Sequence, residues 1–244
     1  MVGKLYGVGV GPGDPELVTL KTYRILRAVD VICAPKARAD RPSQALEVVR
    51  PLLQDAGKKH EIVELIYPMI RDLGVLEAFW ERNSEAIASR LREGKNVAFI
   101  TMGDPMLYST FIYTYRKITE KLPEADVEVI PGVTSLTACA AASKTPIAED
   151  DETVALIPST ADPEKFRELV KHADTIIFIK GVEKLDALAR DLKECGFDES
   201  AIVVRVKGYG TAQEEVKVGS LVELHRWDVE DAYFSTLMVK RVRS

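Results

Sequence analysis

Two stretches decide the fold of this chain: GVGVGPGDPELVTLK, from Gly7 to Lys21, and VAFITMGDPMLYST, from Val97 to Thr110. Each is a short apolar run that breaks into a turn rich in glycine and proline and then continues as helix-compatible sequence. This order places an exposed main-chain loop at the carboxyl end of a strand, where open α/β sheets bind small ligands. The loops carry few charges, with Asp14 in the first and Asp104 in the second, so we expect backbone groups and shape to bind the ligand.

Apolar runs rich in valine and isoleucine alternate with helical patterns almost to residue 205. The expected strands are KLYGVGV, DVICAP, EIVELIY, VAFIT, VEVIP, TVALIP, TIIFIK and AIVVRV. Helices are expected over 77–93, ended by Gly94, and over 164–173 and 183–195, the last closed by Gly196. This alternation predicts mostly parallel sheets with helices on their faces. After Gly208, the runs EEVKVGSLVELHRW and AYFSTLMVKRV alternate without helices and predict antiparallel strands and a hairpin.

The segment SKTPIAEDDE, residues 143–152, is the strongest candidate for a domain boundary. It contains Pro146 and four acidic residues in a row from Glu149, directly before an expected strand. We therefore expect two α/β domains of ordinary size. The first spans 1–145 and carries the loops rich in glycine and proline, and the second spans 151–244 and carries the antiparallel closing strands.

Composition excludes several classes of function. The net charge of -5 and the pI near 5.4 argue against binding of bulk nucleic acid or a membrane surface, which needs a basic field. No apolar run approaches the ~20 residues that span a bilayer, and the first residues do not form a signal core, so a cytoplasmic location is expected. Cys33, Cys139 and Cys195 are isolated and expected to be buried thiols. The three histidines lack the spacing of metal ligands or of a nucleophile–base pair, so no protein-bound metal is expected.

The first loop does not have the spacing of a dinucleotide-binding loop. Gly7-Val8-Gly9 would need a third glycine where the chain has Pro12, and proline also removes an amide that a phosphate cradle would use. Asp14, next to Pro15, is suited to capping a helix. Asp104 in the second loop can likewise cap the helix that follows it.

Taken in order, three segments resemble the successive motifs of the tetrapyrrole (corrin/porphyrin) methylases, which use S-adenosylmethionine. They are GVGVGPGDPELVTLKTYRIL, FITMGDPMLYST and VIPGVTSLTACAA. The resemblance covers nearly the whole chain and continues through TIIFIKG, VKGYGTAQEEV and the closing YFSTLMV. It implies two α/β domains with an active-site cleft between them, a fold distinct from the Rossmann-type methyltransferases, and typically a homodimer.

Within the family, YPM at Tyr67–Met69 and MLYSTFIY after Gly103-Asp104-Pro105 resemble one branch. That branch methylates carbon 20 of precorrin-2, or of its cobalt form cobalt-factor II, in cobalamin biosynthesis. Uroporphyrinogen methylases tend instead to continue with phenylalanine and glycine after Gly-Asp-Pro. Methylation of uroporphyrinogen III or of another corrin precursor is the alternative, and a protein that binds a tetrapyrrole or S-adenosylmethionine without turnover is another.

The resemblance assigns cofactor binding to residues of both domains: Pro12, Met102, Gly103, Asp104, Leu107, Thr134, Ser135, Lys180, Gly208, Thr211 and Ala212. KGYGTAQ can be aligned on either glycine, so Gly208 and Gly210 compete. Asp104 is also the candidate catalytic carboxylate, which takes the proton that leaves carbon 20 or orients the ring. The substrate carries many carboxylates, so a basic rim is expected. Its candidates lie in the loop after DVICAP, where a solvated charged loop is an equally good explanation: Lys36, Arg38 and Arg41.

Overall fold

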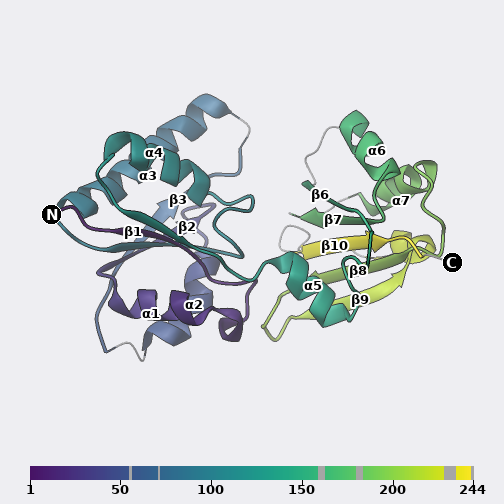
Figure 1. Ribbon diagram of the computed structural model, residues 1–244, viewed down its shortest axis with the longest axis horizontal. Coiled ribbons are helices and arrows are strands. Elements are labelled where there is room, and N and C mark those ends of the chain that lie inside the picture. Colours follow the sequence, from purple (N-terminus) through teal and green to yellow (C-terminus); the bar gives the residue numbers. More distant parts are fainter. Residues whose placement is uncertain (55–56, 71, 159–162, 180–183, 228–234, 243–244) are drawn as a thin grey trace. The chain divides into compact units, whose positions relative to one another are not determined.

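The computed structural model describes residues 1–54, 57–70, 72–158, 163–179, 184–227 and 235–242. The chain divides into two compact units, Met1–Thr134 and Ser135–Ser244. Each unit has its own sheet, with helices on the faces of that sheet (Figure 1). The α/β fold class expected from the alternating patterns is confirmed.

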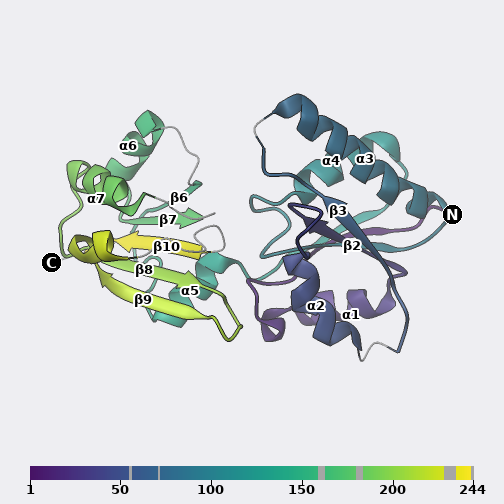
Figure 2. The same cartoon turned by 180° about the vertical axis from the view of Figure 1, so that it is seen from behind.

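The first unit is built on a parallel sheet with the strand order β3-β2-β4-β1-β5. Its strands are β1 (Leu5–Gly9), β2 (Val31–Lys36), β3 (Glu61–Ile66), β4 (Val97–Thr101) and β5 (Val127–Ile130). Its helices are the short 3-10 helix η1 (Pro15–Leu17), α1 (Leu20–Ala28), α2 (Gln44–Gln54), α3 (Leu73–Arg92) and α4 (Phe111–Lys121). α3 and α4 cover one face of the sheet, and α1 and α2 cover the other (Figure 1 and Figure 2).

Strand β4 shows why these apolar runs are uninterrupted. Val97 and Phe99 pack in the cluster that contains Phe111 of α4, whereas Ala98 and Ile100 pack on the opposite face in the cluster of α1 and α2. All of these side chains are fully buried. Because successive strand residues point to opposite faces, a sheet covered on both sides needs apolar residues at every position.

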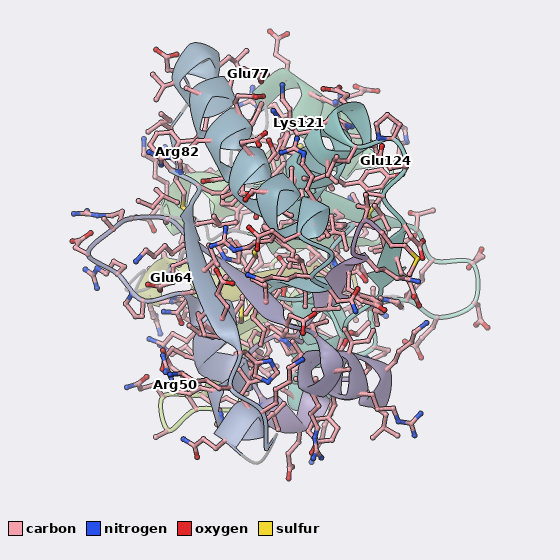
Figure 3. The ribbon with its side chains drawn as sticks, turned by 90° about the vertical axis from the view of Figure 1, so that its left-hand side faces the viewer. Arg50, Glu64, Glu77, Arg82, Lys121 and Glu124 are labelled. Atoms are coloured by element: carbon pink, nitrogen blue, oxygen red, sulfur yellow. The ribbon has the colours of Figure 1, made fainter. Side chains whose placement is uncertain are left out.

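α3 and α4 form a paired layer on their face of the sheet. The ring of Trp80 stacks on that of Tyr113, with centroids 4.2 Å apart and planes at 6°. Lys117 on α4 pairs with Glu77 on α3, and Lys121 pairs with Glu81, one turn further along α3. Glu77 and Lys121 are labelled in Figure 3. This layer holds α4 in place, and with it the loop that leads into α4 from β4.

The second unit contains a mixed sheet with the strand order β6-β7-β10-β8-β9. Its strands are β6 (Val154–Pro158), β7 (Thr175–Ile179), β8 (Ile202–Lys207), β9 (Glu215–Ser220) and β10 (Ser235–Lys240). Its helices are α5 (Ser135–Ser143), α6 (Pro163–Lys171), α7 (Leu185–Glu194) and the 3-10 helix η2 (Leu221–Arg226). β6 and β7 are parallel, while β10 runs antiparallel to β7 and β8, and β9 antiparallel to β8. α6 and α7 lie on one face and α5 on the other (Figure 1).

The division between the units falls at Thr134, before α5, whereas the domains expected from the sequence end at 145 and begin at 151. The difference is α5, which packs on β8, β9 and β10 and so belongs with the second sheet. The acidic segment expected as a boundary is itself fixed to this unit. Lys240 on β10 is buried, and its Nζ lies 2.7 Å from Glu152, 3.2 Å from Glu149 and 3.2 Å from the carbonyl oxygen of Pro146.

The eight strands expected up to about residue 205 are all present, and the closing strands β9 and β10 are antiparallel to their neighbours, as expected. The hairpin joins β9 to β8, and both β9 and β10 pair with β8 rather than with each other. Gly94 and Gly196 follow α3 and α7 with φ of 79° and 85°, the left-handed conformation that commonly ends a helix. One expectation is wrong. LVELHR forms the 3-10 helix η2 rather than a strand, and it begins after Ser220, whose side chain forms a capping box with Glu223.

Candidate active site

The strand order of the first unit places the loops after β4 and β1 side by side. β4 lies next to β1, and the chain leaves these two strands in opposite directions, toward β5 from β4 and toward β2 from β1. These connections run over opposite faces of the sheet, through α1 and α4, and open α/β sheets bind ligands at such places, at the carboxyl ends of their strands. β5 pairs with β1 on its other side, so its loop lies at the same edge. The expectation that each of these loops stands at the carboxyl end of a strand is confirmed.

Three glycines let these loops touch. A Cβ on Gly9 would lie 2.6 Å from the Cα of Gly132, and a Cβ on Gly132 would lie 2.8 Å from the Cα of Gly9. The carbonyl oxygen of Gly103 is nearer still to both of these positions. The N–H of Gly103 donates to the carbonyl oxygen of Gly11 at 2.7 Å. No side chain fits at this junction, so the contact between the backbones requires glycine at Gly9 and Gly132.

Asp104 ties the second loop to the third. Its Oδ1 accepts the N–H of Met106 at 2.8 Å, and its Oδ2 accepts the N–H of Gly132 at 3.0 Å. α4 begins only at Phe111, with Thr110 at its N-cap position. The expectation that Asp104 caps the following helix is therefore wrong, because its carboxylate instead bridges two loops that are far apart in the sequence.

The remaining features of the first loop have structural explanations. A Cβ on Gly7 would run into the ring of Phe111, so this glycine admits α4 rather than a ligand. Asp14 caps η1 by accepting the N–H of Glu16 at 2.8 Å, as expected. Pro12 is buried, whereas Met102, Gly103 and Asp104 of the second loop are half-buried. Leu107, Thr134 and Ser135 are half-buried as well.

The candidate substrate-binding loop follows β2, so it lies at the same edge of the sheet. Two of its three cations already have carboxylate partners. Lys36 is largely buried, and its Nζ lies 3.0 Å from Glu64 (labelled in Figure 3), while Arg38 makes two contacts with Asp40 at 2.9 and 3.1 Å. Arg41 is exposed. Arg41 is thus the most available of the three for a substrate carboxylate.

The other candidate cofactor residues lie in the second unit. Gly208 and Gly210 have φ of 66° and 67°, and a Cβ on Gly208 would meet the carbonyl oxygen of Gln213 at 2.6 Å. The hydroxyl of Thr211 donates to the carbonyl oxygen of Gly208 at 2.8 Å, so this loop is closed on itself. Thr211 and Ala212 are exposed, and Lys180 lies outside the described residues.

Tyr209 is a residue that sequence reasoning missed. It points inward between the two glycines, is 6% exposed, and donates its hydroxyl hydrogen to the carbonyl oxygen of Ser135 at 3.0 Å. Burial raises the pKa of this phenol, which therefore stays protonated. The bond joins the loop after β8 to the first turn of α5. The signal for it was present in the sequence, since a lone aromatic residue between two glycines interrupts an otherwise polar loop.

The other groups that carry potential chemistry have structural roles. Cys33, Cys139 and Cys195 are free and buried, as expected, and burial raises the pKa of Cys33 and Cys139 to about 12. Tyr67 is 5% exposed, and its hydroxyl lies 2.5 Å from that of Thr114 on α4. Among the described residues, no group of three or more His, Cys, Asp or Glu side chains could hold a metal ion. Within the same part of the chain, no helix is long and apolar enough to cross a membrane.

The sequence matches the family described as tetrapyrrole (corrin/porphyrin) methylases over residues 4–225. The chain therefore belongs to this family of methyltransferases, and the family and enzyme class expected from the three loops are confirmed. A probable cobalt-precorrin-2 C(20)-methyltransferase of Methanocaldococcus jannaschii is 36% identical over 100% of this chain and 98% of its own. The cobalt-precorrin-2 C(20)-methyltransferase of Salmonella typhimurium is 33% identical over 99% of this chain and 98% of its own. A precorrin-2 C(20)-methyltransferase of a Sinorhizobium species is 31% identical over 98% and 95%.

Solved structures share the fold. A cobalt precorrin-4 methyltransferase has a TM-score of 0.75 at 23% identity and covers 97% of this chain and 94% of its own. A uroporphyrin-III C-methyltransferase from Thermus thermophilus, complexed with S-adenosylhomocysteine, has a TM-score of 0.72 at 23% identity, covering 98% and 92%. The expected tetrapyrrole methylase fold is confirmed.

Proposed function

We propose that this chain transfers the methyl group of S-adenosylmethionine to carbon 20 of precorrin-2, or of its cobalt form cobalt-factor II, in cobalamin biosynthesis. The observation that carries the proposal is the junction of three strand-end loops at Gly9, Gly103 and Gly132. It occurs in a chain whose relatives over its full length are named for methylation at this carbon.

The loops fit such a cofactor because they offer backbone and apolar groups with one fixed carboxylate. Gly103 has a φ of 63°, and a Cβ there would have only the Cα of Thr134 nearby, at 4.0 Å. A side chain would fill this gap between the second and third loops. We assign cofactor binding to the following residues of the two units: Pro12, Met102, Gly103, Asp104, Leu107, Thr134, Ser135, Lys180, Gly208, Thr211 and Ala212.

The cofactor supplies, when bound, a methyl group on a sulfonium centre that is already a good leaving group. The chain therefore has to bind the cofactor and the substrate, orient them toward each other and exclude water. Positioning alone can supply about 7–11 kcal/mol of the barrier reduction. The glycine junction and the two bonds of Asp104 hold the loops in one arrangement before ligands arrive. This preorganisation is what methyl transfer by proximity needs.

Asp104 has two proposed roles, as a clamp between loops and as a general base. As a clamp, it fixes the second loop to the third by accepting the N–H of Gly132 on Oδ2, while its Oδ1 accepts the N–H of Met106 within the second loop. As a general base, it takes the proton that leaves carbon 20, because each carboxylate oxygen retains a lone pair when it accepts one backbone N–H.

The substrate's carboxylates are proposed to meet the basic loop after β2. Arg41 is exposed and contacts them directly, Arg38 does so by exchanging Asp40 for a substrate carboxylate, and Lys36 supports the loop through Glu64 and the carbonyl oxygen of Ala39. We further propose that the protein acts as a cytoplasmic homodimer with no protein-bound metal.

The experiment that tests this function is methyl transfer from labelled S-adenosylmethionine to precorrin-2, cobalt-factor II and uroporphyrinogen III in parallel. We expect label in one or both of the first two and none in the third. Transfer to uroporphyrinogen III alone would move the chain to the alternative target. Binding of S-adenosylhomocysteine without transfer to any of the three would indicate a binding protein instead of an enzyme.

A further inference from the structure

Three residues other than glycine have a left-handed backbone in the described part of the chain: Tyr108, Lys144 and Asp150, with φ of 50°, 56° and 46°. Two of them have ordinary explanations. Lys144 directly follows the end of α5, where a left-handed residue commonly closes a helix. Asp150 lies in an exposed turn, and aspartate tolerates this conformation. Tyr108 has neither explanation.

The backbone at position 108 is set by its neighbours. Ser109 is buried; its Oγ lies 3.0 Å from the Oγ1 of Thr101 and accepts the N–H of Phe111 at 3.1 Å. Phe111 is fully buried against Gly7. On the other side, the N–H of Leu107 bonds to the carbonyl oxygen of Asp104 at 3.4 Å. Whatever residue stands between Leu107 and Ser109 must therefore make this turn.

A glycine at this position would adopt the left-handed conformation without steric cost, whereas the Cβ of an aromatic residue clashes with the backbone and destabilises the fold. Packing recovers only part of that cost, because Tyr108 is 43% exposed. Met106, two residues earlier, is 53% exposed. Two large apolar side chains thus stand in solvent on the loop that also carries Gly103 and Asp104. The left-handed backbone of Tyr108 is strained, and its exposed ring stands on the loop that carries the candidate cofactor residues. This combination indicates that the ring has a functional contact.

We propose that Tyr108 is a substrate-contacting residue whose ring packs against the flat face of the tetrapyrrole. The inference rests on the proposed function. The tetrapyrrole offers a large apolar face ringed by carboxylates, and an aromatic side chain held on a fixed backbone contacts such a face with little loss of conformational freedom. Tyr108 takes part in no proton or methyl transfer; it holds the ring over the loop.

The test compares Tyr108→Gly, Tyr108→Phe and Lys144→Gly. Binding of precorrin-2, handled without oxygen, and of the stable flat macrocycle uroporphyrin III is followed by fluorescence quenching. Binding of S-adenosylhomocysteine is followed by calorimetry. Tyr108→Gly should weaken binding of both macrocycles about tenfold, the size of an aromatic contact, and leave S-adenosylhomocysteine affinity within twofold. Tyr108→Phe should restore macrocycle binding to within threefold of the wild type.

Lys144→Gly relaxes the same backbone strain at another exposed position, and it should leave all three affinities unchanged. The unfolding temperature of Tyr108→Gly should stay within about 3 °C of the wild type, because backbone relief offsets the lost packing. Wild-type affinity for both macrocycles in Tyr108→Gly would overturn the proposal. An equal loss of S-adenosylhomocysteine affinity would also overturn it, by assigning Tyr108 to loop structure. Tyr108-dependent binding of uroporphyrin III without any binding of precorrin-2 would sustain the role of Tyr108 and overturn the proposed substrate.

Discussion

Replacing Asp104 by asparagine separates a clamp from a general base. The carboxylate accepts two backbone N–H groups, from Met106 on Oδ1 and from Gly132 on Oδ2. Asparagine has one side-chain oxygen, so it can accept only one of these donors, and its NH₂ group must face the other. One backbone N–H therefore faces the NH₂ donor instead of an acceptor: the tie to the third loop is lost when that N–H belongs to Gly132, and the turn of the second loop is weakened when it belongs to Met106.

The size of this effect follows from the lost bond. A hydrogen bond to a charged acceptor contributes about 1.5–3 kcal/mol, and the half-buried position of Asp104 favours the lower part of that range. If cofactor binding requires both the turn of the second loop and its tie to the third, losing either bond costs about 1.5–2 kcal/mol, which corresponds to a 10- to 30-fold weaker affinity for S-adenosylhomocysteine. A pure general base predicts the opposite pattern, with unchanged affinity and turnover reduced by about 10²-fold or more.

Calorimetric titration with S-adenosylhomocysteine and turnover at saturating substrates distinguish these outcomes. The matched control is Asp14→Asn. Asp14 accepts a single backbone N–H, from Glu16 at 2.8 Å, and asparagine caps about as well as aspartate, so affinity and stability should stay near the wild type. If Asp104→Asn binds S-adenosylhomocysteine as tightly as Asp14→Asn and turns over normally, both roles assigned to Asp104 are refuted.

Three further predictions test the other parts of the site. Gly103→Ala and Gly57→Ala each place a Cβ on a left-handed backbone, with φ of 63° and 65°, so both variants should lose about 1–2 kcal/mol of stability. Gly57 has no neighbour within 4 Å and serves as the control, so calorimetry should show weaker S-adenosylhomocysteine binding only for Gly103→Ala. Equal affinities would remove Gly103 from the site. Tyr209→Phe should weaken the same affinity about fivefold, whereas Tyr67→Phe, which loses a hydroxyl contact of an equally buried tyrosine, should lower only the unfolding temperature. The triple variant that replaces Lys36, Arg38 and Arg41 by alanine should have a several-fold higher KM for the tetrapyrrole and a nearly unchanged kcat, and added salt should raise the KM of the wild type in the same way. An unchanged KM of the variant at low ionic strength would exclude this loop from substrate binding.

The order of strands and helices could be predicted because each element carries its own local pattern. The runs VAFI and IIFI are apolar at every position, as strands covered on both faces require, and Gly94 and Gly196 mark helix ends by a conformation that favours glycine. LVELHR misled because apolar and polar residues alternate over a stretch too short to separate a strand from a 3-10 turn.

The contacts that build the site depend on the fold and are not written in any single segment. Asp104 stands before a helical pattern and looks like a cap, but its second partner, Gly132, becomes a neighbour only because β1 pairs with both β4 and β5. The acidic run before β6 looks like a linker for the same reason. Its partner Lys240 lies on a strand from the far end of the chain, and the sequence shows nothing of that pairing.

The ring position that receives the transferred carbon distinguishes the proposed reaction from every alternative methylation. S-adenosylmethionine carrying a ¹³C-labelled methyl group is incubated with the protein and precorrin-2 or cobalt-factor II, and the product is examined by NMR. We expect one new labelled methyl group, bonded to carbon 20. No such product should form when the Gly9–Gly103–Gly132 junction is broken by Gly132→Ala, whose Cβ would collide with backbone atoms of Gly9 and Gly103. With the unmodified protein, a labelled methyl group on any other ring carbon, or none at all, would contradict the proposed reaction.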